Sequence, residues 1–91
     1  MALTKTTVVD KIEVLEMGQV QVRTATRVLE DGVQLSSSFH RHVVEPSTKT
    51  GGSWGDTDIS GEDARVQAIA TATWTTDVKT AYQEMVDAQA L

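Results

Sequence analysis

Two histidines, His40 and His42, are the first candidates for chemistry, because they stand two residues apart in the run FHRH. On an extended strand such residues project from the same face, and imidazole nitrogen is a common metal ligand. The expected strand pairing places them opposite Arg23 and Gln21, on a face with one nearby carboxylate, Glu13. Cations on that face would repel a metal ion. The pattern therefore favours an exposed or interface-forming polar face over a metal site.

Catalytic chemistry finds little support in the residue types present. The chain contains no cysteine, which excludes thiolate nucleophiles, disulfides and cysteine-based zinc or iron–sulfur sites. None of its serines or threonines stands in a nucleophile motif such as G-x-S-x-G. We expect a protein that is not an enzyme, and we assign no catalytic residue, metal or cofactor.

A short acidic segment matches the first half of a calcium-binding loop. Asp56, Asp58 and Ser60 stand at the first, third and fifth positions and precede Gly61, which would permit the turn. The twelfth position is Gln67 instead of the bidentate glutamate, and no helix is expected to lead into the segment. Capping of the following helix by Ser60 is favoured, and calcium binding remains the alternative.

Arg41 falls on the face that the predicted register turns toward the core, where an unpaired charge would be costly. Asp10 lies one diagonal step away across the predicted sheet. A structural ion pair between Arg41 and Asp10 is therefore favoured over a binding role.

Trp54 is flanked by glycines and serine in the stretch GGSWG. An aromatic side chain on such a flexible segment has two interpretations, which the sequence leaves open. It could be a lid folded over a small core, or an anchor at a protein interface. By contrast, Trp74 lies on a helical apolar stripe and is expected in the core. The candidate interface residues are Trp54, Arg23, His40, His42 and Gln21.

Length and charge restrict the class of protein. The 91 residues suit a single domain with an ordinary apolar content of 40%. The formal net charge of −5 is opposite in sign to what nucleic acids or anionic lipid surfaces attract. The sequence shows no long apolar run or signal peptide. We expect neither nucleic acid nor membrane as a partner.

The first half of the chain predicts a three-stranded antiparallel meander. Apolar and β-branched residues alternate over residues 6–15, 19–30 and 33–44, with short breaks at Gly18 and Gly32. A loop ending at Gly18 would oppose Val14 to Val20 and Ile12 to Val22.

The same pairing extends to the rest of the meander. It opposes Val8 to Thr26, and an Asp31-Gly32 turn then opposes Thr24 to Phe39. On this register Phe39 is core, and its truncation to alanine would cost roughly 3–5 kcal/mol. The predicted core face consists of Val8, Ile12, Val14, Val20, Val22, Val28, Leu35, Phe39 and Val43.

The second half predicts a loop over residues 45–59 and a helical part over residues 60–90. Pro46 ends the third strand, and Ser, Thr, Gly and Asp dominate the segment that follows. Two short helices with apolar stripes, separated near Thr75, would lie on one face of the meander. The fold class is therefore α+β, in the order βββαα, as a single domain over residues 1–91.

The complete pattern resembles a group of small uncharacterised virion-associated proteins of tailed bacteriophages, including phages of cyanobacteria. The segments that carry the resemblance are KTTVVDKIEV, VQVRTATRVLEDG, SSFHRHVVEP and GEDARVQAIA. The resemblance implies a structural role in the virion, in the tail or tail fibres, after synthesis in the host cytoplasm. It also implies other virion proteins as partners, and we expect a homo-oligomer.

Two alternatives remain at this point. The first is a capsid decoration, or cement, protein on the surface of the phage head. The second is a small phage-encoded binding or regulatory protein that acts in the host cell. No known functional residues accompany the resemblance, so none is transferred to this chain.

Overall fold

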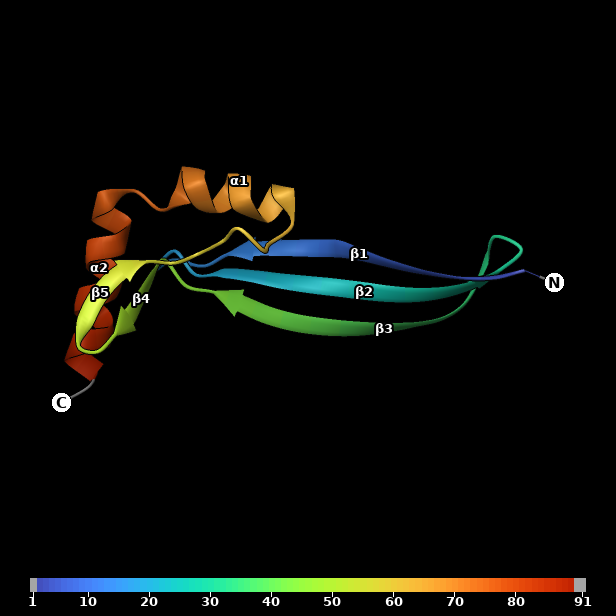
Figure 1. The fold of residues 1–91 in the computed structure, drawn as a ribbon, viewed down its shortest axis with the longest axis horizontal. Coiled ribbons are helices and arrows are strands. Elements are labelled where there is room, and N and C mark those ends of the chain that lie inside the picture. The colour runs from blue at the N-terminus through green and yellow to red at the C-terminus, as the bar shows by residue number, and fades with distance from the viewer. Residues whose placement is uncertain (1, 90–91) are drawn as a thin grey trace.

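The computed structural model describes residues 2–89 and has the predicted α+β class. Residue 90, the end of the predicted helical part, lies outside this range. Three long strands form an antiparallel meander, a short hairpin forms a second sheet, and two helices follow (Figure 1). The elements are β1 (Leu3–Val14), β2 (Val20–Glu30), β3 (Val33–Val44), β4 (Ser47–Thr50), β5 (Ser53–Asp56), α1 (Ala64–Thr73) and α2 (Thr76–Gln89).

The molecule is elongated, with principal extents of 57 × 26 × 23 Å. Its radius of gyration is 17.0 Å, whereas a compact chain of this length would have a radius of about 12 Å. Figure 1 shows why: the helices gather at one end, and the three-stranded sheet extends well past them. We call this extension, residues 3–8 and 25–39, the arm.

The β1–β2 pairing agrees with prediction near the loop and departs from it further along. Val14 pairs with Val20 and Ile12 with Val22, as expected. A bulge at Asp10 then places two residues of β1 against one of β2, so that Val8 pairs with Ala25 instead of Thr26. One extra residue exchanges the two faces. Val9 consequently packs against the core, and the predicted core position of Val8 is wrong.

The β2–β3 pairing likewise agrees with the prediction near its turn and differs from it further along the strands. The Asp31-Gly32 turn forms with positive φ at both residues, and Glu30 pairs with Val33 as expected. Further along, Leu35 is an extra residue, and each later pair is displaced by one position. The displacement turns Phe39 and Val43 away from the core.

The exposure of these residues corrects the predicted core face. Phe39 is 49% exposed and Val43 is 50% exposed. Val8, Val14 and Leu35 are exposed as well, so five of the nine predicted core positions are wrong. Val20 and Val22 are buried as predicted, Ile12 packs against the core, and Val28 is half-buried.

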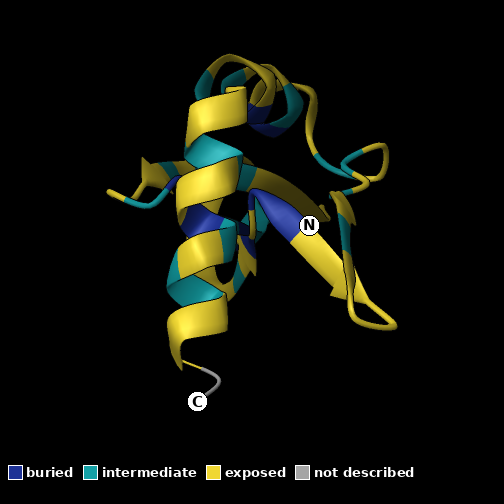
Figure 2. Ribbon diagram, turned by 90° about the vertical axis from the view of Figure 1, so that its left-hand side faces the viewer, coloured by how far each residue is buried: buried dark blue, intermediate teal, exposed yellow. Residues whose placement is uncertain are grey.

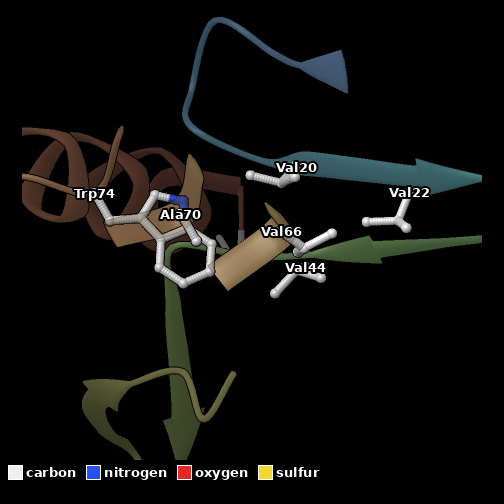
Figure 3. Packing of buried hydrophobic residues seen from close by; sticks show 6 residues of the cluster. All are labelled: Val20, Val22, Val44, Val66, Ala70 and Trp74. Atoms are coloured by element: carbon white, nitrogen blue, oxygen red, sulfur yellow. The ribbon is translucent and has the colours of Figure 1, made fainter. Parts of the chain in front are cut away.

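The observed core lies between the loop end of the sheet and α1 (Figure 3). Val20, Val22 and Val44 face Val66 and Ala70 of α1, together with Trp74 at its end. The helical stripe predicted from the 3.6-residue period is confirmed for α1 and Trp74, since all its members there are buried or half-buried. In α2 the predicted stripe is wrong at Ala81, which is exposed.

The segment predicted as a loop, residues 45–59, contains the β4–β5 hairpin. Gly51 and Gly52 both have positive φ and form the two-residue turn. Lys49 pairs with Trp54 across the ladder. The predicted loop is therefore wrong for this segment. Its Gly- and Ser-rich composition is typical of a loop, but two of the glycines form a tight hairpin turn.

The first helix begins later than predicted, and the second begins where predicted. Asp63, not Ser60, caps α1, and its side chain accepts a hydrogen bond from the Arg65 amide at 2.9 Å. The Ser60 amide instead donates to Asp58 Oδ1 at 2.9 Å. The Thr75 hydroxyl accepts from the Val78 amide at 3.3 Å, so the break predicted near Thr75 is confirmed.

Candidate interface on the open face of the sheet

One face of the three-stranded sheet lies away from α1, and we call it the open face. Strand alternation and the observed ladders assign its members, because directly paired residues share a face. Its charged residues are Lys11, Glu13, Arg23, Arg27 and Arg41, and Asp10, which has no ladder partner, is placed there by its hydrogen bonds with Arg23. Its remaining principal members are Val8, Gln21, Ala25, Phe39 and Val43. The opposite face, which carries Val20 and Val22, is called the helix face.

Arg23 is the most firmly held side chain on the open face. Its Nε donates to Asp10 Oδ1 at 2.9 Å and its Nη2 donates to Asp10 Oδ2 at 2.8 Å. The guanidinium carbon lies 4.5 Å from the centre of the Phe39 ring. The hydrogen bond with Arg23 lowers the pKa of Asp10, and Asp10 in turn raises the pKa of Arg23. The pair keeps Arg23 in one orientation.

This geometry corrects the predicted ion pair. Asp10 has a basic partner, as expected, but that partner is Arg23 and not Arg41. The displaced register pairs Arg41 with Arg23, so Arg41 lies on the open face and is exposed. Among residues 2–89, neither Arg41 nor Arg27 has a carboxylate within ion-pair distance.

Apart from Val43, the rest of the open face is polar near the loop end. Lys11 Nζ lies 2.7 Å from Glu13 Oε1, and this hydrogen bond lowers the pKa of Glu13. Gln21 lies beside Glu13 in the ladder and is exposed. The predicted interface residues Arg23 and Gln21 thus share this face.

The two histidines lie on the helix face, contrary to prediction. His42 pairs with Val22 and His40 with Thr24, because the extra residue in β3 exchanges the faces. They do share one face, as predicted, with ring centres 6.3 Å apart. His42 Nε2 lies 2.7 Å from Glu62 Oε1 and so links β3 to the segment before α1. In the part of the chain that the structure describes, no three His, Asp or Glu side chains are grouped to hold a metal ion.

Trp54 lies far from the open face, on the hairpin beside α2. Its ring meets Tyr82 edge-on at 6.0 Å between centres, and its Nε1 donates to Asp87 Oδ2 at 3.2 Å. Lys49 Nζ lies 5.5 Å from the indole centre and 2.9 Å from Asp87 Oδ1. These contacts attach the hairpin to α2. The five predicted interface residues therefore divide among three places and are not brought together.

The acidic segment proposed as a calcium loop is held by contacts within the protein. Asp56 Oδ1 lies 2.9 Å from Lys79 Nζ. Asp58 accepts from the Ser60 amide, and this hydrogen bond lowers the pKa of Asp58. The Gln67 side chain donates to the Glu62 carbonyl at 2.8 Å. These contacts describe a turn that leads into α1.

Tyr82, the chain's one tyrosine, provides a test of packing between α2 and the hairpin. Burial is the main cause that raises its pKa from 10.0 to about 12, with a hydrogen bond to Glu45 acting in the same direction. The folded protein therefore holds the phenol proton more tightly, and the free energy of unfolding is expected to fall as pH rises between these two values. Tyrosinate absorbance should titrate near pH 12 when folded and near pH 10 in urea. Glu45→Gln should lower the folded midpoint only in part, whereas a folded midpoint near 10 would contradict the burial of Tyr82.

Phe39→Ala is expected to lower the free energy of unfolding by less than about 1.5 kcal/mol, because truncating a half-exposed ring leaves no closed cavity. The matched control is Val44→Ala, since Val44 is 6% exposed and lies at the core; its expected loss is about 2 kcal/mol. Both values can be measured by urea denaturation at low protein concentration. A loss of about 3 kcal/mol or more for Phe39→Ala would restore the register predicted from sequence.

Comparisons with family models, with curated proteins and with solved structures gave no match for this chain. Among the described residues, neither helix has the length and apolar character needed to cross a membrane.

Proposed function

We propose that the chain is a non-enzymatic structural protein of a tailed phage virion, in the tail or tail fibres, and that it functions through protein–protein contacts. The observation that carries the proposal is the arm, which extends past both helices without a second layer (Figure 1). A three-stranded sheet in water normally needs such a layer to bury its apolar side chains. The arm is suited to being covered by another protein.

The apolar residues of the arm support this role. Leu3 is 61% exposed, Val33 is 65% exposed and Leu35 is 57% exposed, all near the tip. Phe39 and Val8 add apolar surface further along the open face. Such residues gathered on one projection are typical of a protein interaction site. Covering them would contribute roughly 25 cal/mol for each Å² of apolar surface removed from water.

The virion is proposed as the setting on the strength of the sequence resemblance. The resembling segments include residues 5–14 of β1 and residues 37–44 of β3, and these two strands form the edges of the three-stranded sheet. A projecting sheet with two free edges is suited to joining neighbouring subunits.

Quantitative mass spectrometry of gradient-purified particles of the encoding phage tests the proposal. Recovery at a few copies per particle is the expected result for a tail or fibre protein. A copy number equal to that of the major capsid protein would contradict the tail location and identify a decoration protein of the head. Absence from particles, with recovery in the soluble host lysate, would overturn the virion role and favour a regulatory protein.

A further inference from the structure

The charges of this acidic protein are unevenly distributed. The open face carries four cations (Lys11, Arg23, Arg27 and Arg41) and two carboxylates (Asp10 and Glu13), which gives a local charge of +2. The remaining four cations and eleven carboxylates of the chain give −7. The sheet face left uncovered by the helices is thus basic, and the rest of the same molecule is strongly acidic.

The outer side of α2 presents a surface that complements the open face. Asp77 and Glu84 are seven residues apart and therefore lie on one side of the helix. Thr80 and Ala81 lie between them, and all four residues are exposed. Figure 2 shows this end of the molecule, with exposed residues recurring along the α2 ribbon that faces the viewer. Small side chains on this side of α2 would let a sheet approach closely.

The free charges on the two surfaces match in number and spacing. Within residues 2–89, Asp77 and Glu84 have no basic group within ion-pair distance, as is true of Arg27 and Arg41. The Cα atoms of Asp77 and Glu84 are separated by about 10 Å along the helix. Arg41 stands four residues beyond Ser37, the ladder partner of Arg27, which corresponds to about 13 Å along the strands. Arginine side chains can span the difference.

We propose that the open face of the sheet binds the outer side of α2 of a second copy of this chain. The inference rests on the proposed assembly function and names the partner. Pairing two open faces, or two α2 surfaces, would bring like charges together, so a symmetric contact through either surface is disfavoured. The contact is instead head-to-tail, and repetition of such a contact builds a closed ring or an open filament.

The open face is large enough for this contact. Three strands of about twelve residues span roughly 40 × 14 Å, or about 550 Å² of sheet surface. The outer side of α2 is the smaller surface, because fourteen residues give a helix about 21 Å long and about 10 Å wide. The contact therefore removes only about 400 Å² from the two partners together, which is well below the usual area of a stable interface. The contact is therefore expected to be weak between free subunits and to strengthen when the assembly closes or a particle holds the subunits together.

Sedimentation velocity of the full chain, from low to high micromolar concentration, tests the contact. The wild-type average mass is expected to rise with concentration, and the rise should be smaller at high ionic strength. The double variants Arg27→Glu/Arg41→Glu and Asp77→Lys/Glu84→Lys should each raise the dissociation constant by at least about tenfold. The matched controls, Lys5→Glu on the helix face of the arm and Glu16→Lys in the β1–β2 loop, should associate as the wild type does.

An equimolar mixture of the two double variants gives the sharpest result. Each variant keeps the surface that the other has lost, although the kept pair now belongs to different copies. The two reversed surfaces are also opposite in charge to each other, so a head-to-tail contact predicts that the mixture associates with the two variants alternating, while each variant alone stays monomeric. A mixture that remains monomeric, or an Arg27→Glu/Arg41→Glu variant that associates normally, would overturn the proposal.

The experiments distinguish failure of the head-to-tail contact from failure of the proposed virion role. A wild-type protein that stays monomeric at every concentration, but is recovered in purified particles, would reject the head-to-tail contact and keep the virion role. Circular dichroism of each variant verifies that the fold is intact, and the restored association in the mixture provides a second verification.

Discussion

Replacing Trp74 with alanine is expected to lower the free energy of unfolding by about 3–5 kcal/mol, because the change leaves a large cavity at the centre of the core. Trp74 is 8% exposed and packs with the core residues of β2 and α1 (Figure 3). Its Nε1 also donates to the Gly18 carbonyl at 2.7 Å, which ties the end of α1 to the β1–β2 loop. A domain of this size has a total stability of only about 5–14 kcal/mol. This single change should therefore remove a large part of it.

The test is urea denaturation followed by far-ultraviolet circular dichroism, which does not depend on tryptophan fluorescence. Trp74→Phe keeps a ring but leaves the Gly18 carbonyl without its donor, and the expected loss is about 1–3 kcal/mol. Trp54→Ala is the second control, since that half-buried indole lies on the hairpin; its expected loss is about 1–2 kcal/mol. Equal losses for Trp54→Ala and Trp74→Ala would contradict the position of the core described above.

The sequence carried enough information for the order of the elements and for the core of the helical half. The period of 3.6 residues located Val66, Ala70 and Trp74 correctly. The geometry of a helix alone determines which residues share a side, whichever surface the helix packs against. The first hairpin pairs were correct as well, because the Gly18 loop fixes the register close to the turn. These are local properties, and local properties are what a single sequence determines well.

The faces of the sheet could not be predicted far from the turns. Each bulge inserts one residue, at Asp10 in β1 and at Leu35 in β3, and neither residue type marks a bulge. Since the side-chain period of a strand is two, each insertion exchanges every later residue between faces. The exchange moved the histidines to the helix face and Arg41 to the open face. Most of the errors about the candidate site follow from these two residues.

The sequence pattern also could not predict how much of the sheet the helices leave uncovered. Strands of twelve residues are about 40 Å long, whereas the ten residues of α1 cover about 15 Å. The fourteen residues of α2 could have covered more of the sheet, but α2 crosses its end instead (Figure 1). Contacts with the hairpin hold it there, including the hydrogen bond from the Gln83 amide to the Ser47 hydroxyl at 3.1 Å. Because the sequence pattern predicts a loop in place of the hairpin, it does not predict the direction of α2.

The unfolding free energy is expected to fall by about 2–4 kcal/mol when Gly18 is replaced with alanine, for two separable reasons. The first is conformational, since Gly18 has φ of +89°, where a side chain costs about 1 kcal/mol. The second is steric. An added Cβ would lie 2.5 Å from Val78 Cγ1 and 3.0 Å from Pro46 Cγ, both parts of the packed interior. Forcing an extra methyl group into such a site typically costs about 1–3 kcal/mol.

Gly32→Ala separates the two contributions, because Gly32 has a similar φ of +84° but nothing within 4 Å of an added Cβ. Its expected loss is only about 1 kcal/mol, which is the conformational cost alone. The difference between the two variants, measured by urea denaturation under the same conditions, is then the steric cost at Gly18. Equal losses would mean that α2 moves away without penalty. The contact between α2 and the β1–β2 loop would then be loose, and the position of α2 at the end of the sheet would not be fixed by packing against Gly18.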